Sequence, residues 1–137
     1  SLRTDPVLAL AVAAALRELD PDLLLVLQAG SPSSDALAAS GHPALAEGFA
    51  DRAYLRGGTL APQRRAGAVI TNVDDVAGRA VALAKGEPVP TLDGASAALE
   101  VATLHVNSNP PHTLEAALAV KGALAAAGVK VQAPNGP

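Results

Sequence analysis

The densest group of residues that could do chemistry lies near the middle of the chain, at residues 47–54, which read Glu-Gly-Phe-Ala-Asp-Arg-Ala-Tyr. A carboxylate such as Asp51 can act as a base or an acceptor, and a guanidinium such as Arg52 can clamp a substrate carboxylate. We interpret residues 48–54 as a strand, on which neighbouring side chains point to opposite faces. Asp51 and Arg52 therefore cannot simply form a salt bridge with each other. They are our candidate catalytic residues, although Arg52 in a structural ion pair elsewhere is an equally good interpretation.

Two other segments place polar groups directly after predicted strands. Gly30 allows close backbone approach and Ser31 offers a hydroxyl, but a Gly-Ser pair after a strand is also an ordinary turn. Asn107 and Asn109 lie between a predicted strand and a helix N-terminus, a place suited to a carboxylate or a phosphate. Asparagine is equally common in turns. His105 and His112 are too far apart to predict a local metal pair, so we predict no metal site and a structural role for each.

The elements that must position these residues follow from periodicity and from turn signals. The predicted helices are 6–19, 36–40, 74–85 and 113–127, with Thr4 or Asp5 as the first N-cap and Thr113 as the last. The predicted strands are 23–27, 48–54, 99–106 and 129–133, with a loop at 59–68 and a turn at 88–94. This alternation predicts one α/β domain over residues 1–137, with a mainly parallel sheet and flanking helices. The carboxyl ends of parallel strands share one edge, so we expect Ser31, residues 51–52 and residues 107–109 to lie at the same end.

Composition excludes several functions. The net charge of −3 and the scarcity of aromatic residues, one Phe, one Tyr and no Trp, argue against nucleic-acid binding. The absence of cysteine is compatible with a reducing compartment, so we expect a cytoplasmic protein, and no apolar stretch is long enough to span a membrane. The sequence has no glycine-rich phosphate loop and no zinc signature. It contains no methionine and begins at Ser1, so we expect a fragment of a longer protein.

Four motifs in this order and spacing resemble the LamB/YcsF family, whose members are A subunits of 5-oxoprolinase. They are Ala29-Gly30-Ser31, Glu47-x-Phe49-Ala50-Asp51-Arg52-x-Tyr54, Gly58-x-Leu60 and Gly67-Ala68-x-Ile70. The resemblance covers nearly the whole chain, as the C-terminal half of that family. It implies half of a distorted β/α barrel and a component of an ATP-dependent 5-oxoprolinase, which opens the cyclic amide 5-oxoproline to glutamate with two partner subunits. ATP would be used by the complex, with no cofactor bound by this chain itself. Our candidate substrate-binding residues are Ser31, Glu47 and Tyr54 of these motifs, together with Asn107 and Asn109 from the loop after the late strand.

Departures from the family pattern limit what the chain is expected to do alone. The family's N-terminal half is missing, and residues 107–109 read Asn-Ser-Asn where the family has His-Gly-Asp. An amide cannot act as a general base near neutral pH. Gln63 also replaces an expected arginine, with Arg64 and Arg65 as possible substitutes. We therefore expect the isolated chain to be inactive and, as half of a barrel, to self-associate. The alternatives are a non-catalytic small-molecule-binding or assembly domain of the same fold, and a generic doubly wound ligand-binding domain.

Overall fold

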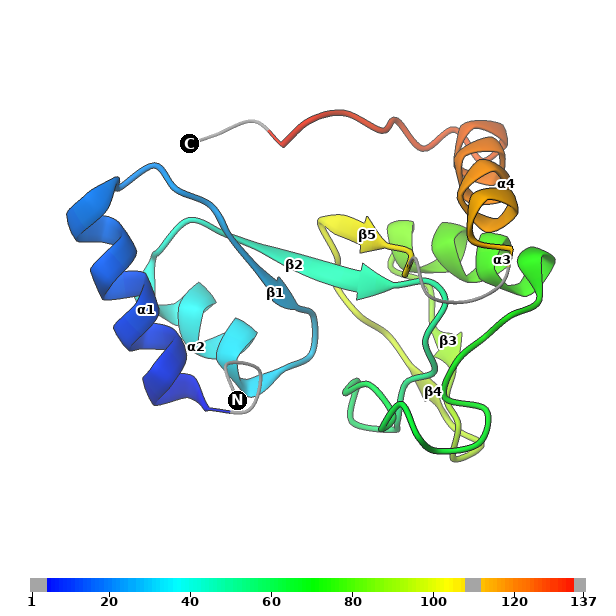
Figure 1. Cartoon of the computed structure of the whole chain (residues 1–137), viewed down its shortest axis with the longest axis horizontal. Helices are drawn as coiled ribbons and strands as arrows, with labels where there is room; N and C mark the ends of the chain where they lie inside the picture. The colour runs from blue at the N-terminus through cyan, green and yellow to red at the C-terminus, as the bar shows by residue number, and fades with distance from the viewer. Residues whose placement is uncertain (1–4, 108–111, 135–137) are drawn as a thin grey trace.

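The computed structural model describes residues 5–107 and 112–134. Its elements alternate between helix and strand along most of the chain (Figure 1). In order they are α1 (Pro6–Leu19), β1 (Leu25–Gln28), α2 (Pro32–Ser40), β2 (Ala44–Phe49), α3 (Val73–Ala84), β3 (Val89–Pro90), β4 (Ser96–Ala97), β5 (Thr103–His105) and α4 (Thr113–Ala126). No helix among these described residues is long and apolar enough to cross a membrane.

The centre of the fold is a three-stranded parallel sheet in the order β1-β2-β5. The central strand, β2, pairs through Gln28↔Glu47 with β1 and through Phe49↔His105 with β5. All three strands run in the same direction, so their carboxyl ends meet at one edge of the sheet. The prediction of an α/β fold with a mainly parallel sheet is confirmed.

One helix pair packs beside β1, and the other packs beside β5 (Figure 1). Near β1, the small side chains Ala9 and Ala13 of α1 pack with Leu37 of α2 and Leu27 of β1. Beside β5, α3 and α4 share a second core cluster with Ala50, which follows β2. These cores consist of alanine, valine and leucine, because small residues let the helices approach one another and the sheet closely.

Capping residues define where the helices begin. The Asp5 carboxylate accepts a hydrogen bond from the backbone N–H of Leu8 at 3.1 Å, and Pro6 occupies the first turn, so α1 begins as predicted. Asn72 caps α3 in the same way through the N–H of Asp75. The prediction of Thr113 as an N-cap is wrong. Thr113 is the first residue of α4, and His112 takes the cap position with a left-handed φ of 65° and no side-chain cap bond.

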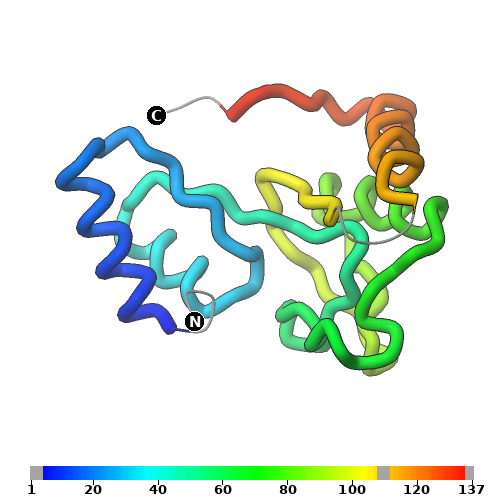
Figure 2. Tube along the Cα trace, in the orientation of Figure 1, coloured from blue at the N-terminus to red at the C-terminus, as the bar shows by residue number. Residues whose placement is uncertain are grey.

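Strand boundaries differ from the prediction. The second strand ends at Phe49 instead of continuing over 48–54, because the chain turns at Ala50 and Asp51. The strand predicted at 99–106 shortens to β5, and the turn at 88–94 belongs to a small antiparallel pair, β3 with β4. The predicted strand at 129–133 is wrong. That segment runs back from α4 past β5 without strand pairing (Figure 2), and with α4 and β5 it lines a groove of about 700 Å³.

Candidate functional site

Alternate residues of β2 and β5 place polar side chains on one face of the sheet at its carboxyl end. Side chains two residues apart on a strand share a face, and register partners in a parallel pair lie side by side. In the register of β2 against β5, Glu47 lies beside Thr103 and Phe49 lies beside His105. Contacts between the next alternate residues, Asp51 and Asn107, continue the row past the strand ends. The opposite face carries apolar side chains, such as Leu27 and Leu104, that pack in the cores.

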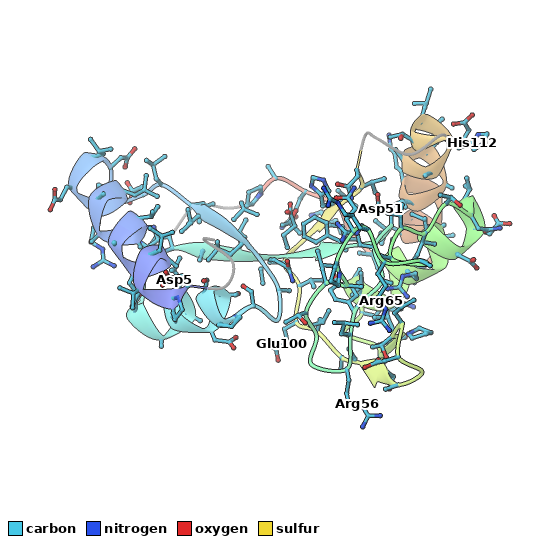
Figure 3. The ribbon with its side chains drawn as sticks, turned by 60° about the horizontal axis from the view of Figure 1, so that its bottom comes forward. Asp5, Asp51, Arg56, Arg65, Glu100 and His112 are labelled. Carbon is cyan, nitrogen blue, oxygen red and sulfur yellow. The ribbon has the colours of Figure 1, made fainter. Side chains whose placement is uncertain are left out.

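Asp51 and Asn107 form the most tightly bonded pair in this row. The buried Asp51 carboxylate accepts a hydrogen bond from the Asn107 backbone N–H at 2.9 Å, and Nδ2 of Asn107 donates to both carboxylate oxygens at 2.9 and 3.0 Å. The Asp51 carbonyl accepts from the N–H of Ile70 at 2.9 Å. Asp51 therefore ties together the chain after β2, the chain after β5 and the segment that leads into α3. In Figure 3, Asp51 lies below His112 and above Arg65 and Arg56.

Glu47 and His105 form a second contact on the same face. Oε1 of Glu47 lies 3.6 Å from Nδ1 of His105. The Phe49 and His105 ring centroids are 4.9 Å apart and the rings are tilted by 39°. The His105 side chain is 41% exposed and that of Glu47 is 22% exposed, so this pair is open to a ligand while Asp51 is not.

Arg52 points away from this row and holds the loop over residues 53–68. Its Nε donates to the carbonyl of Ala68 at 3.2 Å and its Nη2 donates to the carbonyl of Ala61 at 2.8 Å. The side chain is buried, and charge-assisted bonds to carbonyls compensate for its desolvation. This geometry favours a structural role for Arg52, although no carboxylate of residues 5–107 or 112–134 forms the ion pair that one interpretation predicted. Its use as a carboxylate clamp stays a prediction.

Tyr54 lies in the core beneath the loop. Its side chain is 0% exposed and packs with Leu83, Val89 and Leu99. The phenol oxygen accepts a hydrogen bond from the backbone N–H of Phe49 at 2.7 Å. Burial raises the pKa of the Tyr54 hydroxyl above its usual value, so the phenol stays neutral. In this arrangement Tyr54 supports the end of β2 and offers no surface to a substrate.

Ser31 lies at the expected edge but serves as a helix cap. Its buried hydroxyl accepts a hydrogen bond from the backbone N–H of Ser34 at 3.2 Å, at the start of α2. Gly30 before it has a φ of 70°, and a Cβ placed there would lie 2.7 Å from the carbonyl oxygen of Gly58. The loop after β1 is thus packed closely on the turn after Leu55.

The structure confirms that Ser31, Asp51 and Asn107 lie at the same end of the sheet. It brings Asp51, Glu47 and Asn107 onto one face, whereas Arg52 and Tyr54 serve the loop and the core. Asn109 falls outside the described residues. Sequence reasoning missed His105, which we took as a lone structural histidine. The available signal was its place near the end of the predicted strand 99–106, two residues before Asn107.

No group of three or more His, Asp or Glu side chains arranged for a metal ion occurs within residues 5–107 and 112–134. The polar row offers two acid groups, an imidazole and an amide at the carboxyl edge of a parallel sheet. Such an edge is where α/β proteins bind small molecules, because strand ends and helix N-termini converge there. Fold and polar row together define an α/β protein with a candidate small-molecule site.

Comparison with known proteins identifies the family. The sequence model of the LamB/YcsF family matches residues 1–136, so the chain belongs to this family. The 5-oxoprolinase A subunit of Heliobacterium modesticaldum is 40% identical over 129 residues, which cover 94% of this chain and 51% of that protein. The 5-oxoprolinase A subunit of Nocardia farcinica is 41% identical over 126 residues, which cover 92% of this chain and 50% of the Nocardia protein.

A solved structure agrees with this assignment. The crystal structure of the lactam utilization protein from Thermus thermophilus superposes with a TM-score of 0.84 at 36% identity. The match covers 96% of this chain and 52% of that one. The chain therefore spans about half the length of the relatives it matches.

Proposed function

We propose that the chain is the C-terminal half of a 5-oxoprolinase component of the A type, which takes part in the hydrolysis of 5-oxoproline or a similar lactam to the open amino acid. The observation that carries this proposal is the row of Glu47, His105, Asp51 and Asn107 at the carboxyl edge of the sheet, in a chain whose family is LamB/YcsF. The names of the relatives, which are 5-oxoprolinase A subunits and a lactam utilization protein, support the same substrate class.

A half-barrel accounts for the shape of the sheet. β1 and β5 each have one strand neighbour among the described residues, so both edges of the sheet are open. Helices pack on the face that carries Leu27 and Leu104, and the polar row lies on the other. A β/α barrel has this arrangement, with helices outside and polar residues inside at the carboxyl end of its strands. We propose that residues 1–137 form a single β/α unit that a second half completes, and that the uncompleted unit self-associates.

The other requirements of the reaction are assigned to partners. In this proposal two further subunits join the one to which this chain belongs, and the complex uses ATP that this chain does not itself bind. Within the chain, Asp51 and Asn107 fix the two strand ends against each other, and Glu47 lies where a substrate can be reached. We place the complex in the cytoplasm.

A second candidate is a non-catalytic binding or assembly domain of the same fold. The specific observation in its favour is that both oxygens of the Asp51 carboxylate accept hydrogen bonds from Asn107, which leaves this carboxylate poorly placed to act as a base. Association with the partner subunits without turnover in any combination would favour this candidate.

We expect the isolated chain to release no glutamate from 5-oxoproline and ATP. Lactam hydrolysis needs an activated water, a proton donor and an oxyanion site, and half of a site supplies only some of these groups. Binding should persist weakly, with a dissociation constant on the order of millimolar. Glutamate release and calorimetric titration of the same preparation measure both quantities. Turnover by the chain alone would contradict the incomplete site.

A further inference from the structure

We propose that His105 is the proton-transferring residue of this site and that Glu47 is the residue that positions it. The inference rests on the proposed function and names the group that performs its proton transfers. His105 ends β5 at the carboxyl edge of the sheet, with its side chain 41% exposed. It differs from the buried, hydrogen-bonded groups around it because a ligand can reach it.

The neighbours of His105 orient its ring. Oε1 of Glu47 lies 3.6 Å from Nδ1, and the Phe49 ring packs against the imidazole with a centroid distance of 4.9 Å. A carboxylate beside Nδ1 favours the tautomer that carries its proton on Nδ1 and leaves the Nε2 lone pair free. The contact is longer than a hydrogen bond, and catalytic contacts of this kind often shorten only when substrate binds. Nε2, on the other side of the ring, is then the base.

The other polar groups of the row are less suited to this task. The Asp51 carboxylate is buried and accepts three hydrogen bonds from Asn107, and the Asn107 amide does not titrate. Imidazole is the side chain that both gains and loses a proton most readily near neutral pH. Among the described residues of the polar row, His105 is therefore the group best suited to act first as a base and then as an acid.

The proton and bond changes of the hydrolytic step balance at His105, and the ATP that the complex uses in the proposed function is not a reactant in this step. Nε2 of His105 takes one proton from a water molecule while the water oxygen bonds to the lactam carbonyl carbon. The carbon–nitrogen bond of the ring then breaks, and His105 returns the proton to the leaving nitrogen. The products are a carboxylic acid and an amine on one open chain, and His105 is again neutral. Glu47 acts only through His105, as a carboxylate that orients and stabilises the imidazolium.

The chain contains a matched control for the Glu47–His105 pair. His112 and Glu115 lie at the same Nδ1 to Oε1 distance of 3.6 Å, but at the exposed start of α4 with side chains 64% and 62% exposed. Figure 3 shows His112 at that helix end. An effect that follows from any nearby histidine and carboxylate would occur at both pairs, whereas the proposed role belongs to His105 alone.

The first test needs no enzymatic activity. The imidazole ¹⁵N signals of the 137-residue chain, with those of His105 assigned through His105→Gln, should show mainly the Nδ1–H tautomer at a pH where the ring is neutral. Glu47→Ala should shift His105 toward the Nε2–H form, and Glu115→Ala should leave its signals unchanged. If the tautomer ratio of His105 does not change in Glu47→Ala, Glu47 does not position His105 and this part of the proposal is overturned.

The second test uses the active assembly, in which this chain is joined to the missing half from a relative and supplied with partner subunits. His105→Gln should lower the turnover number about 10²–10⁴-fold, with partial recovery of His105→Ala in added imidazole, and His112→Gln should change it less than about twofold. Glu47→Gln should lower the turnover number about 10–100-fold with little change in KM. Turnover that survives His105→Gln overturns this inference alone. No turnover by the unsubstituted assembly overturns the proposed function and, with it, the role of His105.

Discussion

Replacing Gly30 with alanine is expected to lower the free energy of unfolding by about 3–5 kcal/mol. Gly30 has a φ of 70°, and an added Cβ would lie 2.7 Å from the carbonyl oxygen of Gly58 and 2.9 Å from Cδ2 of Leu99. The backbone oxygen cannot rotate away as a flexible side chain would. The alanine variant must therefore push the loop after β1 away from the turn at residues 57–58. Urea unfolding followed by circular dichroism measures the loss as a lower midpoint at an unchanged slope.

Gly41 provides the matched control for this experiment. It has the same φ of 70°, but nothing lies within 4 Å of a Cβ placed there. Gly41→Ala should therefore cost only the left-handed penalty of about 1–2 kcal/mol. The difference between the two variants measures the close approach itself. Equal losses would show that the loop and the turn are not packed as described.

Asp51→Ala is expected to destabilise the chain by about 3 kcal/mol, because it removes the charged acceptor of three hydrogen bonds and leaves the Asn107 N–H without its partner. The loss should also loosen the contact between the ends of β2 and β5. Hydrogen exchange of the Asn107 amide, measured beside urea unfolding, reports both effects.

Two variants test whether the hydrogen bonds explain the loss. Asp51→Asn keeps one acceptor oxygen and should cost less, about 1 kcal/mol. The exposed Asp22 is a control for the loss of a negative charge, and Asp22→Ala should change stability by less than about 0.5 kcal/mol. If Asp51→Ala is as mild as Asp22→Ala, Asp51 does not join the strand ends.

The starts of α1, α3 and α4 were predictable to within one residue because their signals are local, whereas α2 begins at Pro32, four residues before its predicted start. Asp5 and Pro6 mark the start of α1, and an apolar face with acidic residues in its first turn marks α3. Strand limits depend on distant partners instead. Ala44 to Glu47 has weak β-propensity, yet this stretch forms most of β2 because β1 pairs with all four of its residues and β5 pairs with Glu47. Conversely, residues 129–133 alternate like a strand but pair with no strand in the part of the chain that the structure describes.

The site was predictable to the extent that one rule applies: parallel strands end at a common edge, which placed Ser31, Asp51 and Asn107 together. The rule says nothing about which face a side chain occupies once the strand has ended. Asp51 turned to the polar row and Arg52 to the loop carbonyls, because β2 ends two residues before Asp51. The Glu47–His105 contact depends on the register of β2 against β5, and a single sequence does not reveal that register.

A chimera tests most directly the proposal that this chain is the C-terminal half of the A subunit of a 5-oxoprolinase. The chain replaces the matching half of the Heliobacterium modesticaldum protein, which is 40% identical to it, and the chimera is combined with that organism's partner subunits, 5-oxoproline and ATP. We predict glutamate release that depends on both 5-oxoproline and ATP, and none when either half is omitted. A folded chimera that binds the partner subunits but releases no glutamate would contradict the claim.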